Sequence, residues 1–288
     1  MSIVARHVRI EHLTQIIVAG HLRKMQTLLN ETVEYTLVIG DEKIIINSLL
    51  GKKISLSYSG LINCIHCDRK TKKSFSQGYC YPCFQSLAQC DSCIMSPEKC
   101  HYEAGSCREP AWADQNCMTD HFVYLANSSG VKVGITRGNQ IPTRWMDQGA
   151  VQALPIFRVS NRLQSGLVEV VFKDHVADKT NWRKMLKGEV DDLDLCSIRD
   201  QLLEKTSVSI GELQERFGIQ AIQPIVDAEQ VEIKYPVIEY PTKVTSFNFD
   251  KNAVVEGTLM GVKGQYLILD TGVINLRKFG GYHIEFSA

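Results

Sequence analysis

The distribution of cysteine limits what this chain can fold into more than any other feature of its sequence. Of ten cysteines in 288 residues, nine lie between Cys64 and Cys117, and only Cys196 lies outside that segment. The most apolar early stretch, residues 16–19, is too short for a signal-peptide core, so we expect a cytoplasmic protein. Thiols in that compartment stay reduced, and their clustering therefore indicates metal binding rather than disulfides.

The first cysteines of the cluster have the spacing of a four-thiolate zinc site. Cys64 and Cys67 form one Cys-x2-Cys pair, and Cys80 and Cys83 form a second pair twelve residues later. Each pair directs two sulfurs toward one ion, and two pairs complete a tetrahedron. We therefore predict structural Zn²⁺ here, with an iron–sulfur cluster as the alternative that thiolates alone do not exclude.

A second group of potential ligands begins six residues later, so the sequence predicts one or two zinc sites. The favoured ligands of the second site are Cys90, Cys93, Cys100 and Cys107, with Cys117 or His121 as substitutes for one member. All these positions suit a closed site, whereas a catalytic zinc ion keeps one position open for water. A zinc ion here would fold a segment that has little apolar core of its own.

Composition places the chain among soluble globular proteins. Apolar residues make up 44% and charged residues 22%, which argues against disorder. No apolar run reaches the roughly 18 residues that span a bilayer, so we expect no membrane partner. Acidic and basic residues balance at 32 each, so any binding to nucleic acid must depend on a local basic patch.

Hydrophobic periodicity predicts an α+β fold with β-rich N- and C-terminal segments. We expect a helix or two in residues 1–30, helices from residue 142 and over 166–179, and mainly helices in 180–230. The expected strands cover residues 35–39, 43–47, 53–58, 122–125, 132–136, 231–235, 253–260, 266–270, 273–276 and 282–286. No internal repeat at solenoid periods is evident. The expected domains are residues 1–60 (N-terminal helix plus strands), 61–121 (zinc-binding module), 122–230 (α/β domain) and 231–288 (C-terminal β domain).

The α/β domain carries an ordered set of short motifs. A strand contains Tyr124, the returning strand contains Gly134, a following helix carries Arg144, and a later helix carries Glu169. This order resembles the catalytic core of the GIY-YIG nuclease superfamily over roughly residues 120–180. In that superfamily, paired strand motifs carry tyrosines, the next helix supplies an arginine, and a later helix supplies a metal-binding glutamate.

The resemblance implies roles for individual residues. The Tyr124 hydroxyl would help to deprotonate an attacking water, and Arg144 would stabilise charge on the phosphate. Glu169 would hold Mg²⁺ or Mn²⁺. Lys132 stands where the second motif usually has tyrosine, as in one divergent branch, and Gln148 stands where many members have histidine. The alternatives are a core tyrosine, an arginine in a structural ion pair and a glutamate on a helix surface.

A second resemblance covers most of the chain. Residues 20–25, 69–75, 78–83 and 140–145 resemble a bacterial zinc-binding family catalogued as a domain of unknown function, which supports the architecture and implies no activity.

Nucleic-acid contacts are expected from a basic run on the loop between the first two cysteine pairs and from the α/β domain. The candidate contacts are Arg69, Lys70, Lys72, Lys73, Arg137 and Gln148. A basic run on a metal-held loop suits phosphate binding, although a solvated loop is the alternative.

The leading functional hypothesis is therefore a metal-dependent enzyme that processes nucleic-acid phosphodiesters. A non-catalytic protein that binds tRNA or structured RNA is the second hypothesis, and an RNA-modifying enzyme is the third. The sequence leaves open the choice between DNA and RNA, the oligomeric state and the role of the C-terminal β region.

Overall fold

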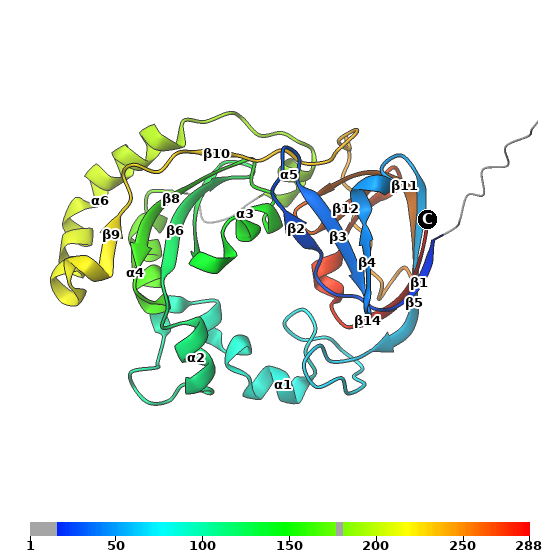
Figure 1. Cartoon of the computed structure of the whole chain (residues 1–288), viewed down its shortest axis with the longest axis horizontal. Helices are drawn as coiled ribbons and strands as arrows, with labels where there is room; N and C mark the ends of the chain where they lie inside the picture. Colours follow the sequence, from blue (N-terminus) through cyan, green and yellow to red (C-terminus); the bar gives the residue numbers. More distant parts are fainter. Residues whose placement is uncertain (1–15, 177–180) are drawn as a thin grey trace, which may run out of the picture.

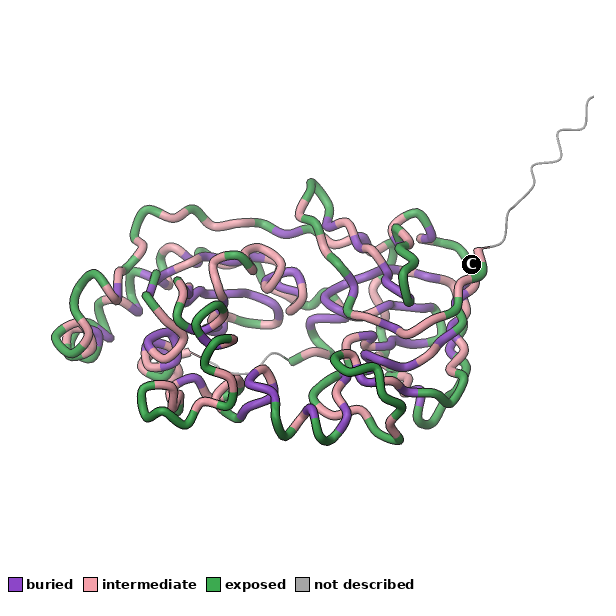
Figure 2. Tube along the Cα trace, turned by 60° about the horizontal axis from the view of Figure 1, so that its bottom comes forward, coloured by how far each residue is buried: buried purple, intermediate pink, exposed green. Residues whose placement is uncertain are grey.

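The structure, a computed structural model, describes residues 16–176 and 181–288 of the chain. It is an α+β protein in which a mixed α/β unit and a β-rich unit stand side by side, with the cysteine-rich segment connecting them along one edge (Figure 1). Buried positions follow the strands of both units, whereas the cysteine-rich segment contains many exposed residues (Figure 2).

The α/β unit is built on an antiparallel sheet. Its strands are β6 (His121–Asn127), β7 (Val131–Arg137), β8 (Gln152–Val159), β9 (Ile222–Pro224) and β10 (Val231–Glu232). Their order is β10-β8-β6-β7, and β9 also pairs with β8. Side chains alternate between the two faces of a strand. Val123 and Leu125 accordingly enter one hydrophobic core, while Tyr124 and Ala126 enter another on the opposite face.

Helices pack on both of these faces. They are α3 (Thr143–Asp147), α4 (Arg162–Lys173), α5 (Trp182–Leu186) and α6 (Leu195–Phe217). Short 3₁₀ turns lie at η5 (Gly138–Gln140) and η6 (Ile219–Ala221). The side chains of Asn161 and Asp194 accept backbone N–H groups at the starts of α4 and α6, which explains where these helices begin. Val168 and Phe172 of α4 bury against the sheet.

The β-rich unit, which we call the β body, combines the two ends of the chain. Its six-stranded sheet, counted over the described residues, has the order β1-β14-β5-β11-β12-β13. Its strands are β1 (Ile17–His21), β5 (Lys53–Ile62), β11 (Val254–Lys263), β12 (Tyr266–Leu269), β13 (Gly272–Asn275) and β14 (Tyr282–Ser287). A smaller sheet contains β2 (Gln26–Leu28), β3 (Glu34–Ile39) and β4 (Glu42–Ile45).

The two halves of the β body share one pattern. In the first half, β3 and β4 form a hairpin that leads through the 3₁₀ turn η1 (Ile46–Leu49) into β5. In the second, β12 and β13 form a hairpin that leads through η7 (Leu276–Phe279) into β14. The halves exchange strands, because β1 pairs with β14 and β11 pairs with β5. Neither half therefore forms this sheet alone.

The cysteine-rich segment contains short helical pieces rather than a sheet. They are α1 (Tyr81–Ser86), η2 (Ala88–Cys90), η3 (Ser92–Ile94), η4 (Pro97–Lys99) and α2 (Pro110–Asn116). Its second part docks on the α/β unit, since α4 packs directly against η4. Contact is so close at Gly166 that a Cβ atom there would lie 2.5 Å from the Glu98 backbone nitrogen.

Two expectations about elements were wrong. The predicted N-terminal helix is replaced by β1 and β2 over residues 17–28; residues 1–15 lie outside the described part. Leu22 and Met25, which suggested helical spacing, are instead buried in the core of the β body. The helix predicted over residues 166–179 is α4, which ends at Lys173; residues 177–180 lie outside the described part. Strand β8 was not predicted, and Pro155 within it weakens the strand signal.

Candidate functional site

The first four predicted ligands meet at one point. The sulfurs of Cys64, Cys67, Cys80 and Cys83 all lie within 4.8 Å of one another, and the Cys67 and Cys80 sulfurs are 3.7 Å apart. A tetrahedron with Zn–S bonds of about 2.3 Å has sulfur–sulfur edges of about 3.8 Å. The cluster is therefore compatible with a structural zinc site.

Local backbone geometry explains this convergence. Strand β5 ends at Ile62, and the chain then turns through Asp68, which adopts a left-handed conformation with φ of 56° and donates its N–H to the Cys64 carbonyl. Cys80 stands at the start of α1. Burial raises the pKa of Cys64, but N–H groups of the two knuckles outweigh that effect and lower it to about 6, which favours the thiolate that binds metal.

The basic loop beside this cluster is open to solvent. The exposed candidates on it are Arg69, Lys70, Lys72 and Lys73. Lys73 lies over the ring of Phe75, with 5.4 Å between its ammonium nitrogen and the ring centroid. Phe75 in turn packs against Tyr81 and Phe84. Phe75 therefore packs inside the module and stabilises it, whereas Tyr81 is 51% exposed and open to solvent.

The later cysteines separate into two places. Cys90 is buried in the hydrophobic cluster of Cys64, Cys80 and Cys83, beneath the first site. The other four, together with Asp91, line one small cavity and are Cys93, Cys100, Cys107 and Cys117. His121 is fully buried and its Nδ1 bonds to the Thr119 carbonyl oxygen at 2.7 Å; burial lowers the pKa of His121 to about 4.

Tyr124 occupies the centre of the α/β sheet. Its side chain is fully buried, and its hydroxyl donates to Oε1 of Gln148 on the turn after α3 at 3.0 Å. The ring packs edge-on against Trp145 and fills the space above Gly134, where a Cβ atom would lie 2.6 Å from the hydroxyl. Burial raises the pKa of Tyr124, so its hydroxyl is protonated at neutral pH.

The other three residues predicted to be catalytic lie close to this hydroxyl or on its face of the sheet. Arg144 and Glu169 both lie close enough to Tyr124 to affect the pKa of its hydroxyl, which Arg144 lowers and Glu169 raises. Glu169, on α4, also pairs with Lys173 at 3.5 Å. Lys132 is buried and pairs with Ala126 across β6 and β7, which puts it on the same face of the sheet as Tyr124.

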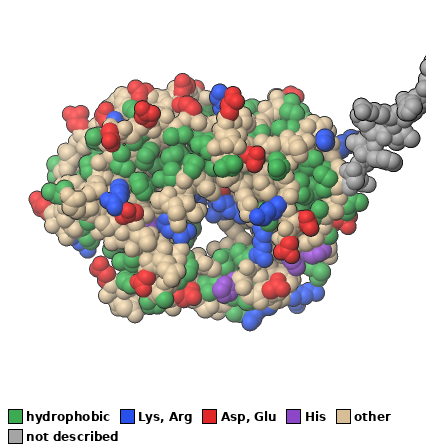
Figure 3. All heavy atoms as spheres, in the orientation of Figure 1, with side chains coloured by type: hydrophobic (Ala, Val, Ile, Leu, Met, Phe, Trp, Pro, Cys, Tyr) green, Lys and Arg blue, Asp and Glu red, His purple; other side chains and the backbone are tan. Residues whose placement is uncertain are grey.

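Arg144 is also part of a positively charged region that spans both units. It acts electrostatically on Arg277 of η7 in the β body and on Arg162 at the start of α4. The pKa of Arg277 is lowered mainly by burial and, to a smaller extent, by the positive charge of Arg144. Arg137 lies in the same region, acts on Arg162 and donates to Asn116. Figure 3 shows an opening through the molecule with lysine and arginine side chains gathered at its rim.

Sequence reasoning did not find Arg162 or Arg277. Arg277 lies more than 130 positions from Arg144, and no motif links them. Arg162 follows the helix-capping Asn161, a position without a functional pattern. The β body packs against α3 through Trp145 and Met146, and this packing brings Arg277 near Arg144.

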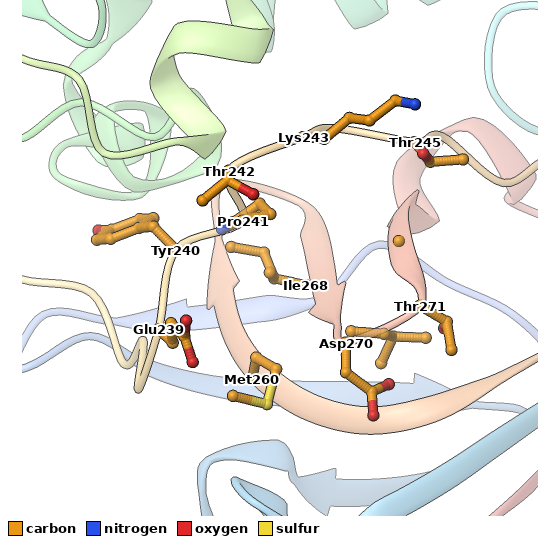
Figure 4. Close-up of a pocket in the computed structure, with 12 residues that line it drawn as sticks. Glu239, Tyr240, Pro241, Thr242, Lys243, Thr245, Met260, Ile268, Asp270 and Thr271 are labelled. Carbon is orange, nitrogen blue, oxygen red and sulfur yellow. The ribbon is translucent and has the colours of Figure 1, made fainter.

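A separate pocket on the β body has a volume of about 390 Å³ (Figure 4). Glu239, Lys243, Asp270 and Thr271 contribute its polar lining. Asp270 already accepts the Thr258 N–H at 2.8 Å, and Thr271 donates to the Glu256 carbonyl at 2.7 Å. These polar groups brace the turn between β12 and β13, and none of the predicted site residues lines the pocket.

Fold and site together define an α+β protein with a cysteine cluster compatible with structural zinc. A family model described as a protein of unknown function (DUF2797) matches residues 51–284, and the chain belongs to this family. Searches of curated proteins and of solved structures found no match. In the described part of the chain, no helix has the length and hydropathy needed to cross a membrane.

Proposed function

We propose that this chain is a metal-dependent enzyme that processes nucleic-acid phosphodiesters on a GIY-YIG-like core. The observation that carries the proposal is that Arg144 and Glu169 both lie close enough to Tyr124 to affect its pKa, beside a region rich in arginine. These three residues span 45 positions of the sequence and lie on one strand and two different helices.

The arrangement of elements supports the same core. Strands β7, β6 and β8 are adjacent in that order, α3 precedes β8, and α4 follows it. This is the order in which the resemblance expects a tyrosine-bearing hairpin, an arginine helix and a glutamate helix.

Glu169 is suited to a hard divalent cation. Mg²⁺ commonly binds through one or two carboxylates and completes its coordination with water and substrate phosphate oxygens. Glu169 offers one carboxylate with 14% of its side chain exposed, close enough to Tyr124 and Arg144 to interact with the hydroxyl electrostatically. Bound there, Mg²⁺ or Mn²⁺ would neutralise charge on the phosphate.

The protein's own groups would perform the remaining tasks. Arg144 would donate to a phosphate oxygen and stabilise the charge that develops on it. Tyr124 is buried and protonated, and its hydroxyl already donates to Gln148, so it would hold Gln148 and Arg144 in place rather than remove a proton from water. Arg277, on the β body, would help to orient the nucleic-acid strand.

A cleavage assay tests the proposal. Duplex DNA, branched DNA, single strands and tRNA are incubated with Mg²⁺ or Mn²⁺ and either the wild-type protein or Glu169→Gln. We expect products that depend on the metal and fall by roughly 10²-fold in the variant. Glu215→Gln on the exposed face of α6 is the matched control and should cleave as wild type does. Equal cleavage by wild type and Glu169→Gln would exclude the assigned site.

A non-catalytic binding protein is the second candidate, and the complete burial of Tyr124 favours it. A hydroxyl without access to water cannot activate one, while the arginines can still hold phosphate. This candidate predicts no products from any substrate, retention of one of them in a gel shift, and equal affinity for wild type and Glu169→Gln.

A further inference from the structure

Four cysteines beyond the first cluster converge on a second enclosed space. Cys93, Cys100, Cys107 and Cys117 line a cavity of about 20 Å³ between η3, η4 and α2. A single water molecule requires roughly 10–15 Å³, so the space suits one small atom or ion. The rest of its lining is largely apolar and includes Ile94 and Trp112.

We propose that this cavity is a second, structural zinc site whose ligands are Cys93, Cys100, Cys107 and Cys117. Cys93 lies in η3, Cys100 follows η4, Cys107 lies in the loop before α2 and Cys117 follows α2. Closing the four around one ion would therefore cross-link short helical pieces that share no sheet. Cys90 is excluded from the set because it is buried in the cluster beneath the first site.

The charge beside the cavity fits a four-thiolate ion site. Arg162 is partly buried, and its electrostatic partners of opposite sign are Cys93 and Cys117. Its guanidinium also donates to the Ile94 carbonyl at 2.6 Å, which fixes it against the cysteine-rich segment. One Zn²⁺ with four thiolates carries a net charge of about −2, which supplies the counter-charge that a buried arginine requires.

A competing set of ligands lies next to this cavity. One potential ligand atom from each of three residues, Asp91, Cys93 and His101, lies within 4.8 Å of the other two. The Asp91 carboxylate, however, accepts from Nε of Arg108 at 2.9 Å and lies 3.4 Å from Nε2 of His101. This ion pair already satisfies the carboxylate, and His101 is not among the residues that line the cavity.

In the described part of the chain, four sulfurs lie within 4.8 Å of one another at the first cluster but not at the second cavity. A zinc ion in the second cavity would draw its four sulfurs inward to edges of about 3.8 Å. The site would thereby tighten the contact between η4 and α4, because Cys100 directly follows η4.

Metal content of purified full-length variants tests the assignment. We expect about two zinc ions per chain in the wild type and about one in either Cys80→Ser or Cys107→Ser. Cys90→Ser, the matched control, should keep about two. One ion in the wild type, or loss of an ion in Cys90→Ser with retention in Cys117→Ser, would overturn the proposal, as would loss in Asp91→Asn or His101→Ala.

A second measurement covers variants that fold poorly without metal. Cys117→His retains a zinc-binding side chain, so the Co²⁺-substituted protein should keep both ions while the absorption of one site changes from four sulfurs to three sulfurs and one nitrogen. Cys90→His should leave the Co²⁺ spectrum unchanged. The reverse pattern would assign Cys90 to the site in place of Cys117.

Discussion

Lys263 is a fully buried cation in the core of the β body. Its ammonium lies 5.3 Å from the ring centroids of both Tyr235 and Tyr240, and within the described structure it has no hydrogen-bond partner. Burial lowers the pKa of Lys263 from 10.5 to about 8. A group with that shift is still charged at neutral pH, so the folded state bears the cost of burying it.

Lys263→Met should therefore stabilise the protein at neutral pH. The shift corresponds to about 3 kcal/mol, of which we expect about 1–3 kcal/mol to appear as an increased free energy of unfolding. The folded pKa lies below the unfolded one, so the wild-type cost is complete below about pH 8 and disappears as pH rises toward 10.5. Urea unfolding at several pH values measures the difference. A variant that is less stable at pH 7, with a gap independent of pH, would contradict this explanation.

Individual residues were predictable where spacing has a chemical meaning. The pairs Cys64–Cys67 and Cys80–Cys83 could be identified because two-residue spacing directs both sulfurs to one ion. Tyr124 and Arg144 were selected through motif order, and in the structure Arg144 lowers the pKa of the buried Tyr124 hydroxyl. Lys263 could not be identified as buried, because its ring partners Tyr235 and Tyr240 lie more than 20 positions away in the sequence.

At the scale of elements, the close contact between α4 and η4 depends on Gly166. An added Cβ atom there would meet the Glu98 nitrogen at 2.5 Å and Pro97 Cβ at 2.6 Å, and backbone cannot move aside cheaply. Gly166→Ala should lower the free energy of unfolding by about 1–3 kcal/mol through overpacking, although alanine favours a helix.

The matched control is Gly211→Ala in α6, where nothing lies within 4 Å of the added atom. This variant should gain about 0.5–1 kcal/mol. Thermal unfolding measures both, and limited proteolysis reports whether Gly166→Ala loosens residues 93–107. Equal stability of the two variants would show that α4 and η4 are not tightly packed.

Element type was predictable for most strands but not at the N-terminus. Leu22, Met25 and Leu28 have spacing that fits a helix, yet β1 and β2 are separated by a break at which Leu22 bridges to Ile39. Because of that break, Leu22 and Met25 both enter the core although they are three positions apart, whereas Leu28 is exposed. Strand β8 carries a proline, and its burial on both faces removes the polar alternation that usually marks a strand.

At the scale of the whole molecule, the pairing of chain ends places Arg277 beside the α/β unit. Strand β14 pairs with β1 and β5, which holds η7 and Arg277 near Arg144. Pairing between segments more than 200 residues apart has no local signal, so the sequence could predict β-rich ends without predicting that they form one body. The presence of Arg277 near Arg144 was unpredictable for the same reason.

The central claim is that the positively charged region around Arg144 binds nucleic-acid phosphate. Fluorescence anisotropy with a labelled duplex, a single strand and a tRNA, at several salt concentrations, tests it directly for wild type, Arg144→Gln and the exposed α6 control Arg216→Gln. We expect affinity to fall as salt rises, with Arg144→Gln binding roughly tenfold more weakly and its log–log salt slope reduced by about 1, while Arg216→Gln matches wild type. Binding that is absent, insensitive to salt, or identical in Arg144→Gln would contradict the claim.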